Sequence, residues 1–355
     1  MKDKKLNFKG QNIYIGIDVH KLRWIISIVF QGMLIKRFSM DPNPKILNEY
    51  LRKHYPGGNY YSVYEAGFSG YWADRELREL GINNIIVNPA DIPTKSKERR
   101  RKDDKIDSAK LARELSVGNL EGIYVLSSSE ESLRNLVRVR EHLKKDQTRQ
   151  KNRIKSLLNF IGAKLPEDIS ERHWSKRYIT ALRKMSIKEP ETKQALNELL
   201  DSLESIRRQI SRIIKNLREI VYSKEESREI IELLMSVPGV GFITAITLYS
   251  EIVDINRFKR LDELAVYVGL SPSVYSSGDK EKTLGLSKQR NKYLRNILIE
   301  SAWVALRKDP ALQMAYGKLR NRMPVQKAII KISRKLLNRI RHVWINKEKY
   351  VLSVV

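Results

Sequence analysis

The sequence contains no cysteine among its 355 residues, which excludes disulfides, cysteine-ligated zinc and thiol catalysis. Its five histidines are scattered and form no ligand pair at helical spacing. No apolar run approaches the length of a membrane span, and the polar, basic first residues show no signal-peptide pattern. These absences predict a cytoplasmic protein with no membrane partner.

Acidic residues are few compared with basic ones. Asp and Glu number 41 against 68 Lys and Arg, a formal net charge of +27. Such an excess predicts attraction to a polyanion, most simply nucleic acid. An anionic membrane surface is the alternative, but the aromatic residues form no lipid-facing stripe.

Residues 12 to about 115 have an α/β pattern. Ile13, Ile15 and Ile17 alternate as a strand that ends at Asp18. Further strands are expected at 24–30, 33–38, 60–64 and 84–87, with a helix over 71–80. Three strands joined by short turns, then strand, helix, strand and helix, is the order of an RNase H-like (RuvC-like) core. We therefore predict three regions: 12–128 as this α/β domain, 129–225 as a helical coiled-coil region and 226–350 as a mostly α C-terminal domain.

Four acidic residues of the α/β region have a pattern that suits metal binding. Asp18 and Glu65 end predicted strands, while Asp104 and Asp107 share one face of a predicted helix. Carboxylates that meet at one end of a sheet suit hard cations such as Mg²⁺ (or Mn²⁺). Two such ions about 4 Å apart can activate both oxygens of a phosphodiester displacement. The alternative is four unrelated surface carboxylates, although Asp18 is poorly placed for a merely solvated face.

Two basic stripes are expected to contact a nucleic-acid backbone, although charge runs are usually solvated faces. One is a basic amphipathic helix over 318–341, broken at Pro324. The other lies over 95–105, where the predicted contacts are Lys95, Lys97, Arg99, Arg100, Arg101 and Lys102.

The middle region contains a heptad pattern that predicts a two-helix coiled coil, within the chain or between chains. Its apolar positions are Leu196, Leu199, Leu203, Ile206, Ile210, Ile213, Leu217 and Ile220. A single long helix packed on its own domain is the alternative.

The C-terminal region begins with a glycine-rich turn, Val237-Pro-Gly-Val-Gly241, between two helical runs. It resembles a helix-hairpin-helix motif, in which backbone N–H groups near Gly239 and Gly241 cradle a phosphate. A plain connecting turn is an equal alternative. Helices are expected over 258–268 and 292–307.

A polar loop is expected over 269–287, and its hydroxyl residues suit a nucleophile that attacks phosphorus. Lys288, Arg290 and Arg295 are the predicted phosphate contacts beside it. These residues alone carry little weight, because serine-rich loops are common.

With these motifs in place, the chain resembles the DEDD-type insertion-sequence transposases of the IS110 class, which are bridge-RNA-guided recombinases. The resemblance covers nearly the whole chain. Its N-terminal motifs are Gly-Ile-Asp-Val-His-Lys at Asp18, Tyr-Glu-Ala-Gly at Glu65 and Lys-x-Asp-x-x-Asp-x-x-x-Leu-Ala at Asp104 and Asp107. Pro-Gly-Val-Gly, Gly-Leu-x-Pro, Ser277-Gly278, Ser-Lys and Leu-Arg follow in the C-terminal half.

The resemblance implies that the four carboxylates bind the metal and that Ser277 forms a covalent link to DNA. It implies donor and target DNA, a structured guide (bridge) RNA, and a homo-oligomer (dimer or tetramer) through the coiled coil, in which one protomer's tetrad meets another's serine. The setting would be a prokaryotic cell, with the protein associated with the nucleoid.

Two departures from the family pattern are visible. Arg290 stands where relatives have Gly, and Asp103 precedes Asp104. The three-residue gap to Asp107 favours Asp104 as the ligand, and the Ser-Gly motif favours Ser277 over Ser276.

Two competing functions use the same residues differently. One is a RuvC-like, metal-dependent junction endonuclease with water as the nucleophile and no role for Ser277. The other is a non-catalytic nucleic-acid-binding protein whose carboxylates are remnants.

Overall fold

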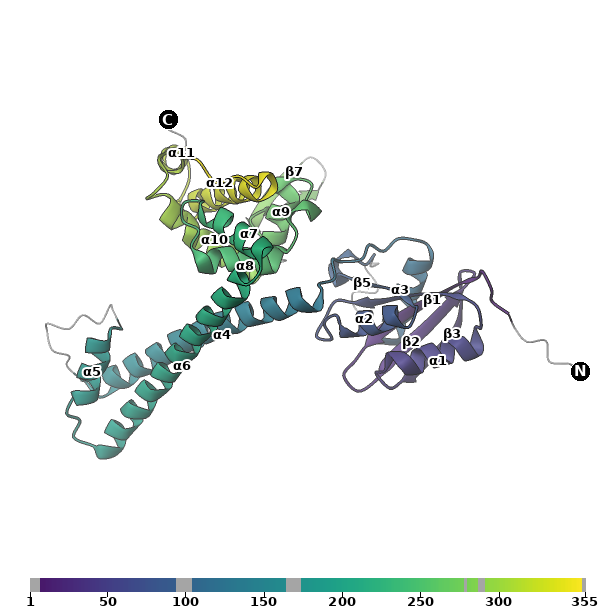
Figure 1. The fold of residues 1–355 in the computed structure, drawn as a ribbon, viewed down its shortest axis with the longest axis horizontal. Helices are drawn as coiled ribbons and strands as arrows, with labels where there is room; N and C mark the ends of the chain where they lie inside the picture. Colours follow the sequence, from purple (N-terminus) through teal and green to yellow (C-terminus); the bar gives the residue numbers. More distant parts are fainter. Residues whose placement is uncertain (1–6, 94–103, 164–173, 278–279, 287–290, 353–355) are drawn as a thin grey trace, which may run out of the picture. The chain divides into compact units, whose positions relative to one another are not determined.

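The computed structural model describes residues 7–93, 104–163, 174–277, 280–286 and 291–352, with the side chains of 104–106 and 272–284 also outside this description (Figure 1). The chain divides into two compact units, residues 1–127 and 128–355. The first is a mixed α/β unit and the second is mostly helical, which confirms the coarse fold prediction. Within the described ranges, no helix combines the length and the apolar character needed to cross a bilayer.

The first unit is built on a five-stranded sheet in the order β3-β2-β1-β4-β5. The first three strands are antiparallel neighbours, whereas β4 and β5 extend the sheet in parallel. The strands are β1 (Asn12–Val19), β2 (Trp24–Phe30), β3 (Met33–Met40), β4 (Asn59–Glu65) and β5 (Asn83–Val87).

Helices cover both faces of this sheet. Ile13, Ile15 and Ile17 pack with residues of α1 (Pro44–His54) and α2 (Trp72–Glu79) on one face. On the other face Val63 packs with Leu111 of α3 (Asp104–Ser116). A short 3-10 helix, η1 (Pro89–Asp91), follows β5. Alternate residues of a strand face opposite sides of the sheet, so the three isoleucines of β1 all lie on the α1 side while Gly16 lies on the α3 side.

The second unit begins with a helical arm. Its helices are α4 (Ser128–Phe160), α5 (Lys176–Lys184) and α6 (Pro190–Tyr222). Ile154 packs with Leu200 at one end of the arm, and Val137 lies with Leu217 at the other end. The two long helices therefore pair antiparallel within the chain, as Figure 1 shows.

The rest of the second unit is a helical head around one core. Its elements are α7 (Glu225–Met235), α8 (Phe242–Ile252), η3 (Ile255–Arg257), α9 (Leu261–Val268), β6 (Pro272–Ser277), β7 (Lys280–Leu286), α10 (Lys292–Ala305), α11 (Pro310–Arg320) and α12 (Val325–Asn346). The predicted break at Pro324 is confirmed, because α11 ends at Arg320 and Pro324 caps α12.

Two sequence predictions about local structure were wrong. The segment 269–287, expected as a polar loop, contains the antiparallel hairpin β6–β7. The helix expected over 258–268 begins later, at Leu261, because η3 and an extended residue at Phe258 precede it.

Candidate active site

Asp18 and Glu65 occupy equivalent positions at the ends of two neighbouring parallel strands. The register of β1 and β4 pairs Ile17 with Tyr64, and Asp18 and Glu65 are the next residues on each strand. Adjacent strands lie about 4.8 Å apart, and in-register residues of parallel strands face the same side of the sheet. The sheet therefore brings these two carboxylates together.

The side they face is the one covered by α3. A Cβ on Gly16 would lie 1.9 Å from the carbonyl oxygen of Ser108 and 2.7 Å from the amide nitrogen of Ala112. Only a residue without a side chain allows this approach of helix to strand. The Oγ atoms of Ser27 and Ser108 are hydrogen-bonded at 2.9 Å on the same face. Asp18, two residues beyond Gly16 on the same strand, shares that face.

The helix α3 supplies the remaining predicted carboxylates. Asp107 is half-buried and directly precedes Ser108, the residue that contacts Gly16. Asp104 is the first residue of α3, but its side chain lies outside the described residues. Among the side chains that the structure does describe, no three His, Asp or Glu residues converge as a metal site. The geometry thus pairs Asp18 with Glu65 and sets Asp107 on the covering helix, and among the four predicted ligands these are the three whose side chains are described.

His20 was not singled out by the sequence analysis. Its Nε2 atom lies 2.9 Å from Oδ2 of Asp18, and its ring is 40% exposed. The available signal was the Asp-x-His spacing, because residues two apart at a strand end share one side. A nitrogen held against Asp18 can fix the orientation of that carboxylate.

The donors on this face fit a hard divalent cation. All the predicted ligands are carboxylates, the donor type that Mg²⁺ and Mn²⁺ prefer. Asp18 is 21% exposed and Glu65 is exposed, so both are accessible from solvent.

Ser277 belongs to the second unit. It is the last residue of β6, and its backbone is paired with Lys280 of β7, while Ser276 is paired with Glu281. Consecutive positions of a strand belong to opposite faces of a hairpin, so the two serines are not equivalent. Their side chains lie outside the described residues, as do Lys288 and Arg290.

Asn291, the first described residue after this hairpin, is tied to the arm by a buried carboxylate, which the sequence analysis also missed. Glu251 of α8 is fully buried and accepts two hydrogen bonds from Arg138 of α4, at 2.7 and 2.8 Å. Asn291 donates to the same carboxylate at 2.7 Å and caps α10 by accepting from Tyr293 N–H at 3.0 Å. Burial alone lowers the pKa of Arg138, but the Glu251 carboxylate outweighs burial and raises it.

The two glycines of the Pro-Gly-Val-Gly turn differ in role. Gly239 has a φ of +87°, and a Cβ there would lie 2.4 Å from the carbonyl oxygen of Ser301, so α10 packs directly on the turn. Gly241 is exposed, has open space around it and caps the N-terminus of α8. Close packing therefore accounts for Gly239, whereas the surroundings of Gly241 leave room for the phosphate contact expected from the sequence.

The other predicted phosphate contacts are only partly described. The stripe Lys95, Lys97, Arg99, Arg100, Arg101 and Lys102 lies outside the described residues. Arg295 is 5% exposed, which does not favour contact with a phosphate backbone in this conformation.

In comparisons with known proteins, part of each unit matches a family of transposases. Residues 15–162 match an IS110-type DEDD family described as "Transposase", and residues 231–317 match "Transposase IS116/IS110/IS902 family". The first match spans the four acidic residues, and the second spans Gly239, Ser277 and Arg295.

Three curated relatives illustrate the similarity. The transposase for insertion sequence element IS1111A of Coxiella burnetii is 27% identical, with 68% of this chain and 64% of that protein covered. The transposase for insertion sequence element IS1533 of Leptospira borgpetersenii is 24% identical, with coverage of 90% and 99%. A pilin gene-inverting protein of Moraxella lacunata is 28% identical over 80% of each chain.

Proposed function

We propose that this chain, like the IS110/IS116 transposases that both of its units resemble, cuts and rejoins DNA, and that it does so through four carboxylates and one serine. The carboxylates are Asp18, Glu65, Asp104 and Asp107, and the serine is Ser277. The observation that carries the proposal is the shared register and face of Asp18 and Glu65, under a helix that carries Asp107.

The carboxylates would hold Mg²⁺ or Mn²⁺, which stabilises negative charge on the phosphate oxygens when bound. The residues of this chain fit that role, since Gly16 lets α3 approach the sheet and His20 orients Asp18. Like-charged carboxylates so close together favour a cation between them.

The serine step exchanges one phosphodiester for another. The Ser277 oxygen forms a bond to phosphorus while the bond from phosphorus to a deoxyribose oxygen breaks. The serine proton is lost to a base, and the leaving oxygen gains a proton. Attack by that hydroxyl, or by one from the other DNA, reverses the step and rejoins the strand.

Two partners complete the proposal. A structured RNA would pair with donor and target DNA, which accounts for a strongly cationic chain in which we recognise no base-reading module. Self-association would use the arm, where Ile206, Ile210 and Ile213 of α6 are only partly buried by α4. A second copy can cover such residues.

A trapping assay tests the serine. The full chain is incubated with donor DNA and Mg²⁺, and covalent protein–DNA adduct is measured after denaturation. We expect adduct with the natural chain and with Ser276→Ala, and none with Ser277→Ala or Asp18→Asn. Metal-dependent cleavage that survives Ser277→Ala would instead identify a water-dependent junction endonuclease.

A second assay tests the guide. RNA that copurifies with the chain should be a discrete species, and RNase should abolish site-specific joining while sparing salt-sensitive nonspecific binding. Correct joining by RNase-treated protein would contradict the guide.

A further inference from the structure

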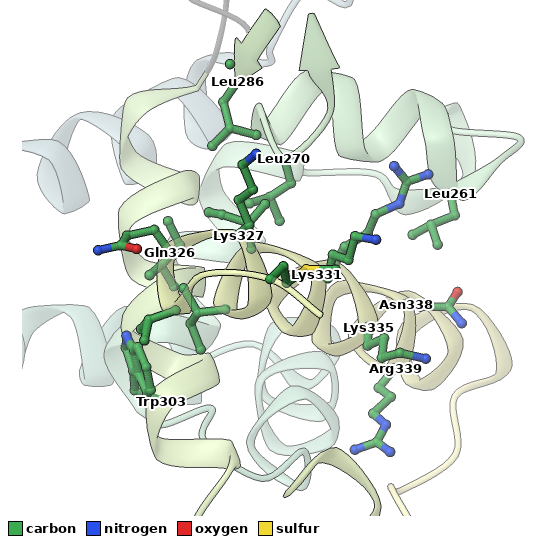
Figure 2. Close-up of a pocket in the computed structure, with 17 residues that line it drawn as sticks. Leu261, Leu270, Leu286, Trp303, Gln326, Lys327, Lys331, Lys335, Asn338 and Arg339 are labelled. Atoms are coloured by element: carbon green, nitrogen blue, oxygen red, sulfur yellow. The ribbon is translucent and has the colours of Figure 1, made fainter. Parts of the chain in front are cut away.

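The head of the second unit contains a groove of about 1400 Å³ along α12 (Figure 2). Its lining comes from α12, from α10, from the start of α9 and from the end of β7 at Gly285 and Leu286. Figure 2 shows Trp303 and Gln326 at one end of the groove and Asn338 and Arg339 at the other. The groove thus reaches the open end of the β6–β7 hairpin, where Leu286 is paired with Pro272, whereas Ser277 lies at the turn end of the same hairpin.

One wall of the groove is cationic. Lys327, Lys331 and Lys335 follow one another at four-residue spacing on α12, and all three are exposed. This spacing places them on one side of the helix with a rise of about 6 Å between neighbours. Arg334 and Arg339 also line the groove, and their guanidinium groups are paired with Asp262 and Asp309. No carboxylate is found among the described residues that line it.

The floor of the groove is apolar and contains one accessible aromatic ring. Ile299, Ile329 and Ile330 contribute the aliphatic surface. Trp303 is 38% exposed, and the ring of Tyr316 lies edge-on against it with centroids 5.7 Å apart. A supported indole beside lysines is the arrangement on which an unstacked base rests while the cations follow the backbone.

We propose that this groove binds an unpaired strand of the DNA substrate, beside the hairpin that carries Ser277. The lysine row contacts successive phosphates, and one base stacks on Trp303. The amides of Gln326 and Asn338 are available to base edges. A regular duplex fits this lining poorly, because its bases are already stacked and cannot reach an indole face. That the strand is DNA and not RNA rests on the proposed function. That the groove binds a single strand rests on its lysines and on Trp303 alone.

Binding is measured with the full chain in EDTA, so that no cleavage is needed. The probe is a 12-nucleotide oligo-dT with one 2-aminopurine, titrated over a series of salt concentrations. The groove variant is Lys327→Gln/Lys331→Gln/Lys335→Gln. The control is Lys184→Gln/Lys188→Gln/Lys224→Gln, which removes three exposed lysines elsewhere in the same unit. Thermal melting checks that each variant is folded.

The groove variant should lower the slope of log affinity against log salt by about 2, because each single-strand phosphate contact contributes about 0.7. The control should leave most of the slope intact. Trp303→Ala should weaken binding by roughly 5- to 100-fold and abolish 2-aminopurine quenching without changing the slope, while Trp303→Phe retains most of both.

Three outcomes would overturn the proposal. In the first, the two lysine variants lower the salt slope equally. In the second, the Trp303 variants weaken binding of a duplex of the same length as much as binding of the single strand. In the third, the groove variants weaken binding of an oligo-U RNA but not binding of the DNA strand. Failure of the serine chemistry is distinguished from these, since the assay is run in EDTA and measures binding without any cleavage or covalent link.

Discussion

At the scale of single residues, Gly16 decides how close the helix α3 comes to the sheet. In Gly16→Ala the added methyl meets backbone atoms of α3, which cannot move aside as a flexible side chain does. We expect a loss of about 1–3 kcal/mol in the free energy of unfolding, from overpacking. DNA cleavage should fall even where the variant is folded, because α3 carries Asp107. Denaturant titration and a cleavage assay measure the two effects.

Gly67→Ala is the matched control in the same unit. The nearest atom to a Cβ there is 3.9 Å away, so its stability should change by less than about 0.5 kcal/mol. If Gly16→Ala were as stable and as active as the natural chain, the close packing of α3 on β1 would be wrong.

Tyr64, the residue before Glu65, gives a pH dependence. Burial raises the pKa of its hydroxyl above the ordinary value of 10, and the nearby Asp74 raises it further. The folded chain therefore keeps a proton that the unfolded chain loses above pH 10. Stability is complete below that pH and falls as the pH rises towards the folded pKa, by about 1.4 kcal/mol per pH unit for each such group.

Tyr64→Phe should make this decline shallower between pH 10 and 11, as measured by urea unfolding. Equal slopes in the natural chain and in Tyr64→Phe would show that Tyr64 does not titrate with folding.

At the scale of elements, the Glu251 carboxylate joins α4, α8 and the start of α10. Glu251→Gln leaves the Arg138 guanidinium partly buried without its counter-charge. Removing one partner of a buried ion pair costs about 3–5 kcal/mol, and we expect unfolding of the second unit to shift by that amount. Chemical denaturation followed by circular dichroism measures it.

Glu300→Gln provides the comparison, because Glu300 also pairs with α4, through Lys144 at 3.9 Å, but is 71% exposed. Exposed pairs contribute about 0–1 kcal/mol, so this variant should unfold almost as the natural chain does. A similar small effect at Glu251 would mean that the arm is not held to α10 through this carboxylate.

The sequence predicted the elements whose pattern is local. The alternation before Asp18, the helix over 71–80 and the break at Pro324 follow from residue periodicity and proline geometry, and all three are present. The helix α1 was not expected, although Asn43 caps it and Pro44 begins it. Leu47 and Leu51 are buried and lie four residues apart, beside Ile46 and Tyr50, so the sequence carried a helical signal here that was not used.

The arm shows why packing is harder to predict than helicity. The heptad pattern predicted Leu199 and Ile220 on the buried seam, but Leu200 and Val221 are the residues fully buried, and Ile220 is 41% exposed. The pairing partner decides which neighbouring positions are covered, and that partner, α4, has no such heptad to signal it. The Glu251 network was invisible for the same reason, since Arg138 lies 113 positions from Glu251 and Asn291 lies 40 positions from it.

At the scale of the whole molecule, the candidate carboxylates belong to one unit and Ser277 to the other. If one copy supplies the carboxylates and another supplies the serine, two inactive variants should restore activity when mixed. Asp18→Asn and Ser277→Ala are unfolded together, refolded as a mixture and assayed for covalent DNA adduct. If the copies pair at random, about half of the dimers contain one copy of each variant. Each mixed dimer has one intact site out of two, so we expect about a quarter of the natural activity.

The control mixture combines Asp18→Asn with Glu65→Gln. Both changes damage the same carboxylate group, so no arrangement of the two copies creates an intact site, and activity should stay absent. Refolding each variant alone excludes recovery caused by the procedure. If the first mixture is as inactive as the second, while size-exclusion chromatography shows that mixed dimers form, then each copy uses its own serine and the site is completed within one chain.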